Sequence, residues 1–296
     1  RGRRQTPVRG VKESTMAIRV VTAPRTLAGS GRASRPGALT VAARRVGTFA
    51  GDFGLVLAVI GVYFLVRGAA PERIGYALEV TKGLVRVEQA AGVFQEQRVQ
   101  ALSIRYHAVQ EVANFTYAYL HFPVLAAVGA WVWWAKGRER FAFMRDVMFV
   151  SMAIGVVFYY LAPAAPPRLL AAHGYDLGFT DTVFGGNTAV NYAQPSLILN
   201  EYAAIPSFHF GWIAMASAAI WVNTGSRVVR GLAVALTVLM TWAIVASANH
   251  LFIDMALGGV VIGVSWVVAG RLHRPARVLV METTDSTSVA GGRLAA

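Results

Sequence analysis

The sequence contains no cysteine among its 296 residues, and only 15% of its residues are charged. The missing thiols exclude disulfide bonds and thiol chemistry. The scarcity of charge, beside a hydrophobic content of 55%, excludes an ordinary soluble domain and indicates a polytopic membrane protein. The apolar runs are continuous rather than alternating, which excludes membrane-spanning strands. We therefore expect an all-α membrane fold.

Acidic residues are scarce as well, because 15 Asp and Glu residues oppose 28 Lys and Arg residues, for a net charge of +13. Such an excess can indicate nucleic-acid binding. Its distribution argues against that partner, since 11 of the 28 basic residues lie before residue 50, outside the apolar runs. A basic segment beside a membrane span is typical of the cytoplasmic side, where it contacts anionic headgroups. We expect the membrane, and no nucleic acid, as the partner of this charge.

The first segment, residues 1–45, is rich in Arg, Gly, Ser, Thr and Pro, which predicts a disordered basic cytoplasmic tail. The chain begins with Arg rather than Met, and Met16 is a candidate start. The first apolar run has no small-residue cleavage site after it, so we expect a retained span rather than a removed signal peptide. The transmembrane domain is expected over residues 46–270, followed by a cytoplasmic tail at 271–296.

The apolar runs predict a bundle of six transmembrane helices, because only helices satisfy their own backbone hydrogen bonds in lipid. Basic residues gather in the first tail and after the second, fourth and sixth runs. The positive-inside rule therefore places both termini in the cytoplasm of a cell-membrane protein. Residues 76–111 alternate apolar and charged residues at helical spacing, which predicts outer amphipathic helices, with a solvated connector as the alternative. The six runs lie at 49–67, 114–135, 146–163, 206–222, 230–248 and 251–270.

Two short segments place polar groups at the start of apolar runs. The segment Pro206-Ser207-Phe208-His209 opens the fourth run, and His250-Leu251-Phe252-Ile253-Asp254 opens the sixth. Such groups are costly in lipid and are rarely placed there without a use. Arg168 follows the third run. In the orientation given above, all of these residues fall at the outer face of the membrane, so we expect one active site there.

These residue types predict phosphoryl transfer. His250 and Asp254 are four residues apart, so on a helix the carboxylate can accept one ring N–H and leave the other nitrogen as a nucleophile. His209 comes from another helix and can protonate the leaving group. Ser207 lies at a helix N-terminus that favours anions, and Arg168 can bind phosphate oxygens in a bidentate manner. Together they predict attack on a phosphoester through a phosphohistidine.

Other interpretations use the same residues. His121 lies near the outer end of the second run, where it either contacts the substrate phosphate or packs in the core. The other two histidines could also be packed core residues. A His/His/Asp set could bind zinc, but Ser207 and Arg168 would then be unexplained, so we predict no metal. A non-catalytic lipid transporter could use the same cavity, although ion-coupled carriers hold acidic groups at mid-membrane and here the polar set lies at one rim.

The polar segments resemble the signatures of the type 2 phosphatidic acid phosphatase (PAP2) superfamily. Pro206–His209 resembles the second signature, whose common form is Pro-Ser-Gly-His, and His250-x-x-x-Asp254 resembles the third. Pro163-x-x-Pro166-Pro167-Arg168 resembles the first, in the form found in the inositol-phosphoryltransferase branch that includes inositol phosphorylceramide synthases. The resemblance covers residues 46–270. It implies a six-helix bundle, the residue roles given above, and chemistry without a cofactor.

Three positions depart from the phosphatase pattern. Leu161 stands where the pattern has a Lys, Ile244 where it has an Arg, and Phe208 where it has a Gly. A phosphodiester carries less charge than a phosphomonoester and needs fewer cations. We therefore predict inositolphosphotransferase-like transfer of a phosphoryl headgroup from a lipid phosphate or phospholipid to a lipid alcohol. The alternative is a phosphatase for lipid or polyprenyl phosphates. The lipid, the headgroup and the oligomeric state stay open.

Overall fold

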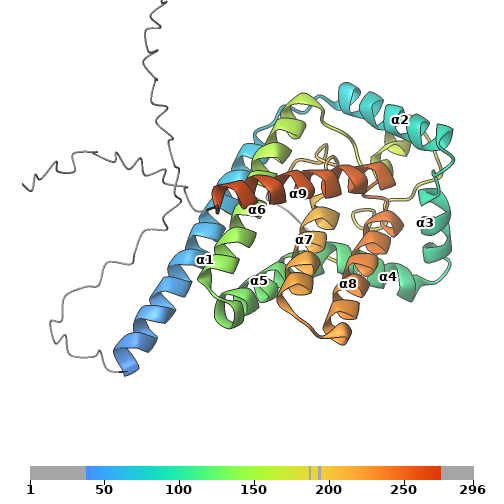
Figure 1. The fold of residues 1–296 in the computed structure, drawn as a ribbon. Coiled ribbons are helices and arrows are strands. Elements are labelled where there is room, and N and C mark those ends of the chain that lie inside the picture. The colour runs from blue at the N-terminus through green and yellow to red at the C-terminus, as the bar shows by residue number, and fades with distance from the viewer. Residues whose placement is uncertain (1–37, 187, 193–194, 275–296) are drawn as a thin grey trace, which may run out of the picture. The chain divides into compact units, whose positions relative to one another are not determined.

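The computed structural model describes residues 38–274, apart from residue 187 and residues 193–194. Within these residues the chain forms helices and no β-strand, so the predicted all-α class is confirmed (Figure 1). Helix α1 begins at Ala38 and therefore includes residues that we assigned to the first tail. The remainder of that tail, and nearly all of the tail at 271–296, lie outside the described residues. The helices are α1 Ala38–Gly68, α2 Ile74–Ala90, α3 Glu96–Ile104, α4 His107–Phe115, α5 His121–Trp131, α6 Arg138–Leu161, α7 Phe208–Asn223, α8 Arg227–Ala246 and α9 Phe252–Leu272.

Among the described residues, five helical segments are long and apolar enough to cross a membrane. One of them, His107–Lys136, consists of α4 and α5 with a π-helical turn, Thr116–Leu120, between them and a second, Val132–Lys136, after α5. Helix α7 has only 16 residues, fewer than the about 20 that a crossing needs, so the sixth span stays a prediction. The five segments are Leu39–Gly68, His107–Lys136, Arg138–Leu161, Arg227–Ala246 and Phe252–Leu272.

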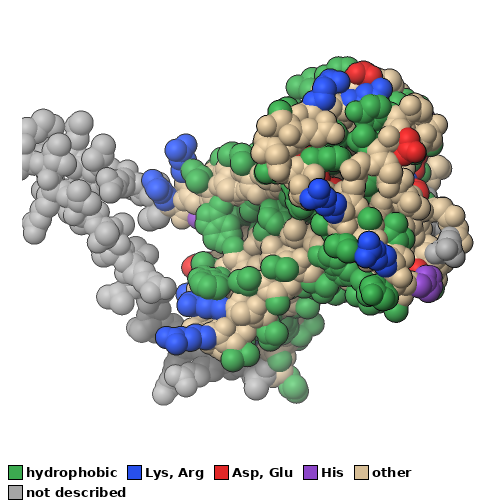
Figure 2. All heavy atoms as spheres, turned by 90° about the vertical axis from the view of Figure 1, so that its right-hand side faces the viewer, with side chains coloured by type: hydrophobic (Ala, Val, Ile, Leu, Met, Phe, Trp, Pro, Cys, Tyr) green, Lys and Arg blue, Asp and Glu red, His purple; other side chains and the backbone are tan. Residues whose placement is uncertain are grey.

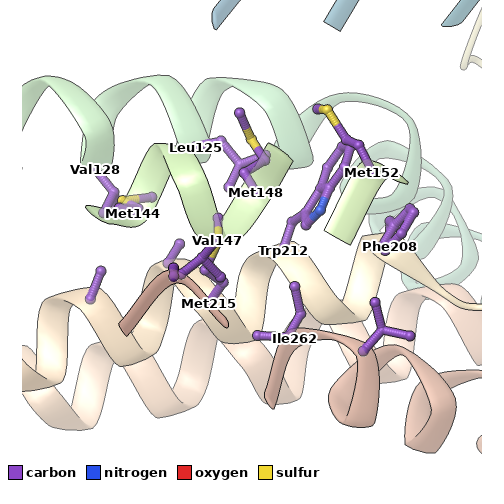
Figure 3. Packing of buried hydrophobic residues seen from close by; sticks show 14 of the residues in the cluster. Leu125, Val128, Met144, Val147, Met148, Met152, Phe208, Trp212, Met215 and Ile262 are labelled. Carbon is purple, nitrogen blue, oxygen red and sulfur yellow. The ribbon is translucent and has the colours of Figure 1, made fainter. Parts of the chain in front are cut away.

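The largest hydrophobic cluster lies where α5, α6, α7 and α9 meet (Figure 3). Methionines of α6 pack there against Trp212 and Met215 of α7, while Leu125 and Ile262 come from α5 and α9. Outside this core, large hydrophobic side chains stay exposed along the long helices. Figure 2 shows hydrophobic side chains over much of one face, between scattered Lys and Arg residues. Such a surface suits a membrane-embedded protein.

The beginnings of α7 and α9 are in direct backbone contact. The Ser207 N–H donates to the Asp254 carbonyl oxygen at 3.0 Å. Gly258 permits this approach, because a Cβ built there would lie only 2.3 Å from the Ser207 carbonyl oxygen. Small residues at helix interfaces allow such close backbone approach in membranes. The two polar segments are therefore held together by the helix packing itself.

Helices α2 and α3 lie beside the beginning of α9 (Figure 1). The buried residues of α2 recur every three or four positions, as in Ala77, Thr81, Val85 and Glu88, and so occupy one face. Helical structure within 76–111 is thus confirmed. The location of these helices at the outer membrane surface stays a prediction.

Candidate active site

One cavity is lined by four of the six predicted site residues: His121, His209, His250 and Arg168. They come from α5, the first turn of α7, the turn before α9, and the turn that follows α6. The other two predicted residues, Ser207 and Asp254, do not line this cavity. Both are buried behind its wall. The three polar segments thus meet in one place.

His250 and Asp254 form the contact that their spacing predicted, though by a different route. Helix α9 begins at Phe252, so His250 precedes the helix instead of sharing a helical face with Asp254. The His250 Nδ1 lies 3.4 Å from the Asp254 Oδ2, which also accepts the Leu251 N–H at 2.9 Å. At 3.4 Å the contact is longer than a typical hydrogen bond. The other ring nitrogen of His250, Nε2, takes no part in this contact.

His209 lies among other aromatic rings at the cavity wall. Its ring centre is 5.8 Å from that of His250 and 4.8 Å from that of His121. The Tyr117 ring is tilted against it, with the two ring centres 4.6 Å apart. The His121 side chain is buried, and its Nε2 has no hydrogen-bond partner among the described residues. Two histidines besides His250 therefore present ring nitrogens near one space.

Ser207 lies at the N-terminus of α7, as its sequence position predicted, and is the N-cap residue that precedes the first turn. Its hydroxyl oxygen accepts the Phe210 N–H at 3.5 Å, and the residue has no exposed surface. This is the usual way that serine satisfies an otherwise unpaired N–H at a helix start. The hydroxyl is therefore engaged in the helix, and its contact with phosphate stays a prediction.

Arg168 is a heavily bonded side chain. Its Nε donates to the Asn249 Oδ1 at 3.0 Å, and its Nη1 forms an ion pair with Asp181 at 2.8 Å. Its Nη2 lies 3.6 Å from a carboxylate oxygen of Glu201, and the guanidinium stacks over Phe184 at 4.2 Å. These contacts fix the guanidinium at the cavity wall, with much of its charge already balanced by carboxylates.

Arg67, a cavity residue that our sequence analysis missed, ends α1. Its Nη2 donates to the Asn200 carbonyl oxygen at 2.9 Å, and the Asn200 side chain donates back to the Arg67 carbonyl at 3.0 Å. In the sequence Arg67 was only one basic residue at the end of an apolar run. The signal available was its position at the outer end of a span.

Two buried carboxylates hold the start of α9. Glu88 accepts the Ile253 N–H at 2.6 Å, and Glu96 accepts the Phe252 N–H at 2.8 Å. Both belong to the segment 76–111, whose amphipathic pattern predicts an exposed charged face, yet they are only 2% and 0% exposed. They are buried because the first N–H groups of a helix need acceptors. Burial and the neighbouring Glu96 raise the pKa of Glu88 to about 8.

The unusual Phe208 is accommodated by a glycine on the facing helix. A Cβ at Gly155 of α6 would lie 2.3 Å from the Phe208 ring, which stacks on Trp212 at 4.9 Å. The ring occupies space that a side chain on α6 would otherwise take. The other two departures lie outside the cavity: Leu161 is 67% exposed, and Ile244 is buried in a separate cluster.

Residues 82–268 match the family model described as the PAP2 superfamily, which is more than half of the chain. The chain belongs to the PAP2 superfamily. No curated protein and no solved structure gives a significant match. Membership in the PAP2 superfamily makes the protein an enzyme of the phosphatase or phosphotransferase kind. A lipid substrate is consistent with the five apolar helices. Helix α1, which carries Arg67, lies outside the matched segment.

Proposed function

We propose that this PAP2-superfamily enzyme transfers a phosphoryl headgroup from a phospholipid to a lipid alcohol, as in the inositol-phosphoryltransferase branch, through a phosphohistidine at His250. The observation that carries the proposal is the arrangement of three residues. His250 lines the cavity, and Asp254 lies 3.4 Å from its Nδ1. The ring centres of His209 and His250 are 5.8 Å apart. A nucleophile oriented by a carboxylate, with an acid nearby, is what such a transfer requires.

In the first step the His250 Nε2 attacks phosphorus, and the bond between phosphorus and the leaving oxygen breaks. His209 gives its proton to that oxygen, so a neutral lipid alcohol leaves. Asp254 stabilises the positive charge that develops on the His250 ring. In the second step the acceptor hydroxyl loses its proton to His209 and attacks phosphorus. The P–N bond breaks, which restores His250 and leaves His209 protonated for the next cycle.

Hydrolysis is the second candidate, because water can replace the lipid alcohol in the second step. The family match covers phosphatases and phosphotransferases alike. A lipid or polyprenyl phosphate would then be the substrate, and inorganic phosphate the product. The same His250 and His209 serve both reactions, so only the products distinguish them.

The products can be identified with purified enzyme in liposomes. One set contains phosphatidylinositol as donor and a diacylglycerol with deuterated acyl chains as acceptor, so that the transfer product differs in mass from the donor, and a second contains phosphatidic acid alone. A new phosphodiester lipid detected by mass spectrometry supports transfer, while release of inorganic phosphate supports hydrolysis. His250→Ala should abolish either reaction, while His173→Ala, a change at an exposed histidine, should not. Full turnover in His250→Ala would refute the mechanism.

The site is proposed to face outward, with both termini in the cytoplasm. This orientation rests on the basic residues near the opposite ends of the helices, such as Arg138 and Arg227. Because the chain has no cysteine, single cysteines report on it directly. In intact cells a membrane-impermeant thiol reagent should label Ser196→Cys and leave Gly225→Cys unlabelled. The reverse pattern would contradict the orientation.

A further inference from the structure

Four charged side chains of the described residues lie in or beside the wall of the cavity. Arg67, Arg168 and Glu201 line it, and Asp181 contacts Arg168 from behind. Their formal charges cancel. An anionic substrate nevertheless needs positive charge where it binds. The question is therefore which of the two arginines can offer its charge to a phosphate group.

The positive charge of Arg168 is paired with protein carboxylates. Asp181 lies at 2.8 Å and Glu201 at 3.6 Å, and Asn249 accepts from the remaining Nε. Each guanidinium nitrogen therefore has a partner, and the side chain is only 5% exposed. A phosphate that bound Arg168 would have to share the guanidinium with these carboxylates, of which Asp181 is 24% and Glu201 39% exposed.

Arg67 is in the opposite situation. It donates to the Asn200 backbone carbonyl, which carries no net charge, and none of the ion pairs within the described residues includes it. Its guanidinium lies 5.9 Å from the ring centre of Tyr159, another cavity residue. The positive charge of Arg67 is thus held at the cavity without a carboxylate partner.

The position of Arg67 is built into the packing. Gly68, the next residue, approaches the chain at Leu197 so closely that an added Cβ would lie 2.3 Å from the Leu197 carbonyl oxygen. This approach brings the end of α1 against the segment that carries Asn200. The reciprocal hydrogen bonds between Arg67 and Asn200 then fix the arginine.

We propose that Arg67 is a phosphate-binding cation of this site beside Arg168, and that Glu201 adjusts the site toward singly charged phosphodiesters. The inference rests on the proposed function. Arg67 supplies from α1 the positive charge that Leu161 and Ile244 do not. A phosphomonoester near pH 7 carries between one and two negative charges, whereas a phosphodiester carries one. The carboxylate of Glu201 repels the additional charge and also binds the charge of Arg168.

The proposal is tested by steady-state kinetics on the full chain in liposomes, with phosphatidylinositol and phosphatidic acid as probes. Arg67→Gln should raise KM for both lipids by about 10- to 100-fold, the effect expected on losing a charge-assisted hydrogen bond. Arg67→Lys should recover part of this loss. Arg86→Gln, at an exposed arginine of α2, should leave both lipids unaffected. Glu201→Gln should raise kcat/KM for phosphatidic acid relative to phosphatidylinositol at least fivefold, by removing one repulsive charge.

A second readout separates this inference from the reaction itself. Inorganic phosphate should raise the thermal unfolding temperature of the wild type and of Arg86→Gln, but not that of Arg67→Gln. If the wild type turns over lipid while Arg67→Gln matches it in KM and in phosphate stabilisation, the role of Arg67 is refuted and the proposed function stands. If the ratio between the two lipids is unchanged in Glu201→Gln, the role of Glu201 is refuted. A folded wild type that neither turns over lipid nor responds to phosphate would overturn both the function and the inference.

Discussion

Gly258→Ala tests whether the contact between α7 and α9 forms the active site. The added methyl group would lie 2.3 Å from the Ser207 carbonyl oxygen and 3.2 Å from the Ser207 carbonyl carbon. Both are backbone atoms, so no side chain can rotate away to make room. The two helix starts must separate, and the hydrogen bond from the Ser207 N–H to the Asp254 carbonyl must lengthen from 3.0 Å.

The size of the effect follows from the overlap. An ordinary contact begins near 3.4 Å, so the helices must move apart by about 1 Å. Overpacking of this kind costs about 1–3 kcal/mol in stability. His209 lies two residues after Ser207 and His250 lies just before α9, so the same movement separates the two histidines. A displacement of about 1 Å between reacting groups can lower the rate by about 100-fold.

The assay compares kcat on the preferred lipid with the thermal unfolding temperature in detergent. Gly263→Ala is the matched control, because it makes the same change in the same helix where nothing lies within 4 Å. We expect Gly258→Ala to unfold several degrees lower and to lose about two orders of magnitude in kcat. Gly263→Ala should resemble the wild type. Equal activity and stability in the two variants would refute the close approach of α7 and α9.

Two further predictions concern stability. Glu88 is protonated in the folded chain up to a pKa of about 8 but ionises near its ordinary value of 4.5 when unfolded, so stability should fall as the pH rises between these values. Glu88→Gln should flatten that pH dependence when thermal unfolding is measured over a series of pH values. Glu96 and Asp254, the other carboxyl groups near Glu88, are unchanged in this variant. An unchanged pH profile would contradict the shift. Gly155→Ala should lower the unfolding temperature by displacing the Phe208 ring, with a cost of about 1–3 kcal/mol; an unaltered unfolding temperature would argue against that packing.

The helices and the meeting of the three signatures could be predicted from the sequence, since both follow from local pattern. Continuous apolar runs can only be helices in lipid, and segments that are predicted to open or close such runs at one membrane face are able to meet there. His209, His250 and Arg168 were found in this way. Phe208 was recognised as unusual, but its compensation by Gly155 required the packing of α6 against α7.

The rest depended on contacts between distant segments. Arg67 reaches the cavity because Gly68 lets α1 pack against the chain near Asn200, and nothing local to residue 67 records that contact. From the sequence alone, Glu88 and Glu96 are expected on an exposed charged face. The structure places beside them the backbone N–H groups at the start of α9, which donate hydrogen bonds to both carboxylates. Local periodicity describes one helix at a time, whereas a charge or a hydrogen-bond partner from another helix decides whether a polar side chain is buried.

The central claim is that His250 attacks phosphorus. The most direct measurement is a rapid-quench reaction with phosphate-labelled lipid, followed by mass spectrometry of the peptide that contains His250 under conditions that preserve phosphohistidine. We predict the transferred phosphoryl group on a nitrogen of His250 in the wild type, with its inositol still attached when phosphatidylinositol is the donor, and no such adduct in His250→Ala. Phosphate on another residue, or continued turnover without any covalent phosphate, would contradict the account.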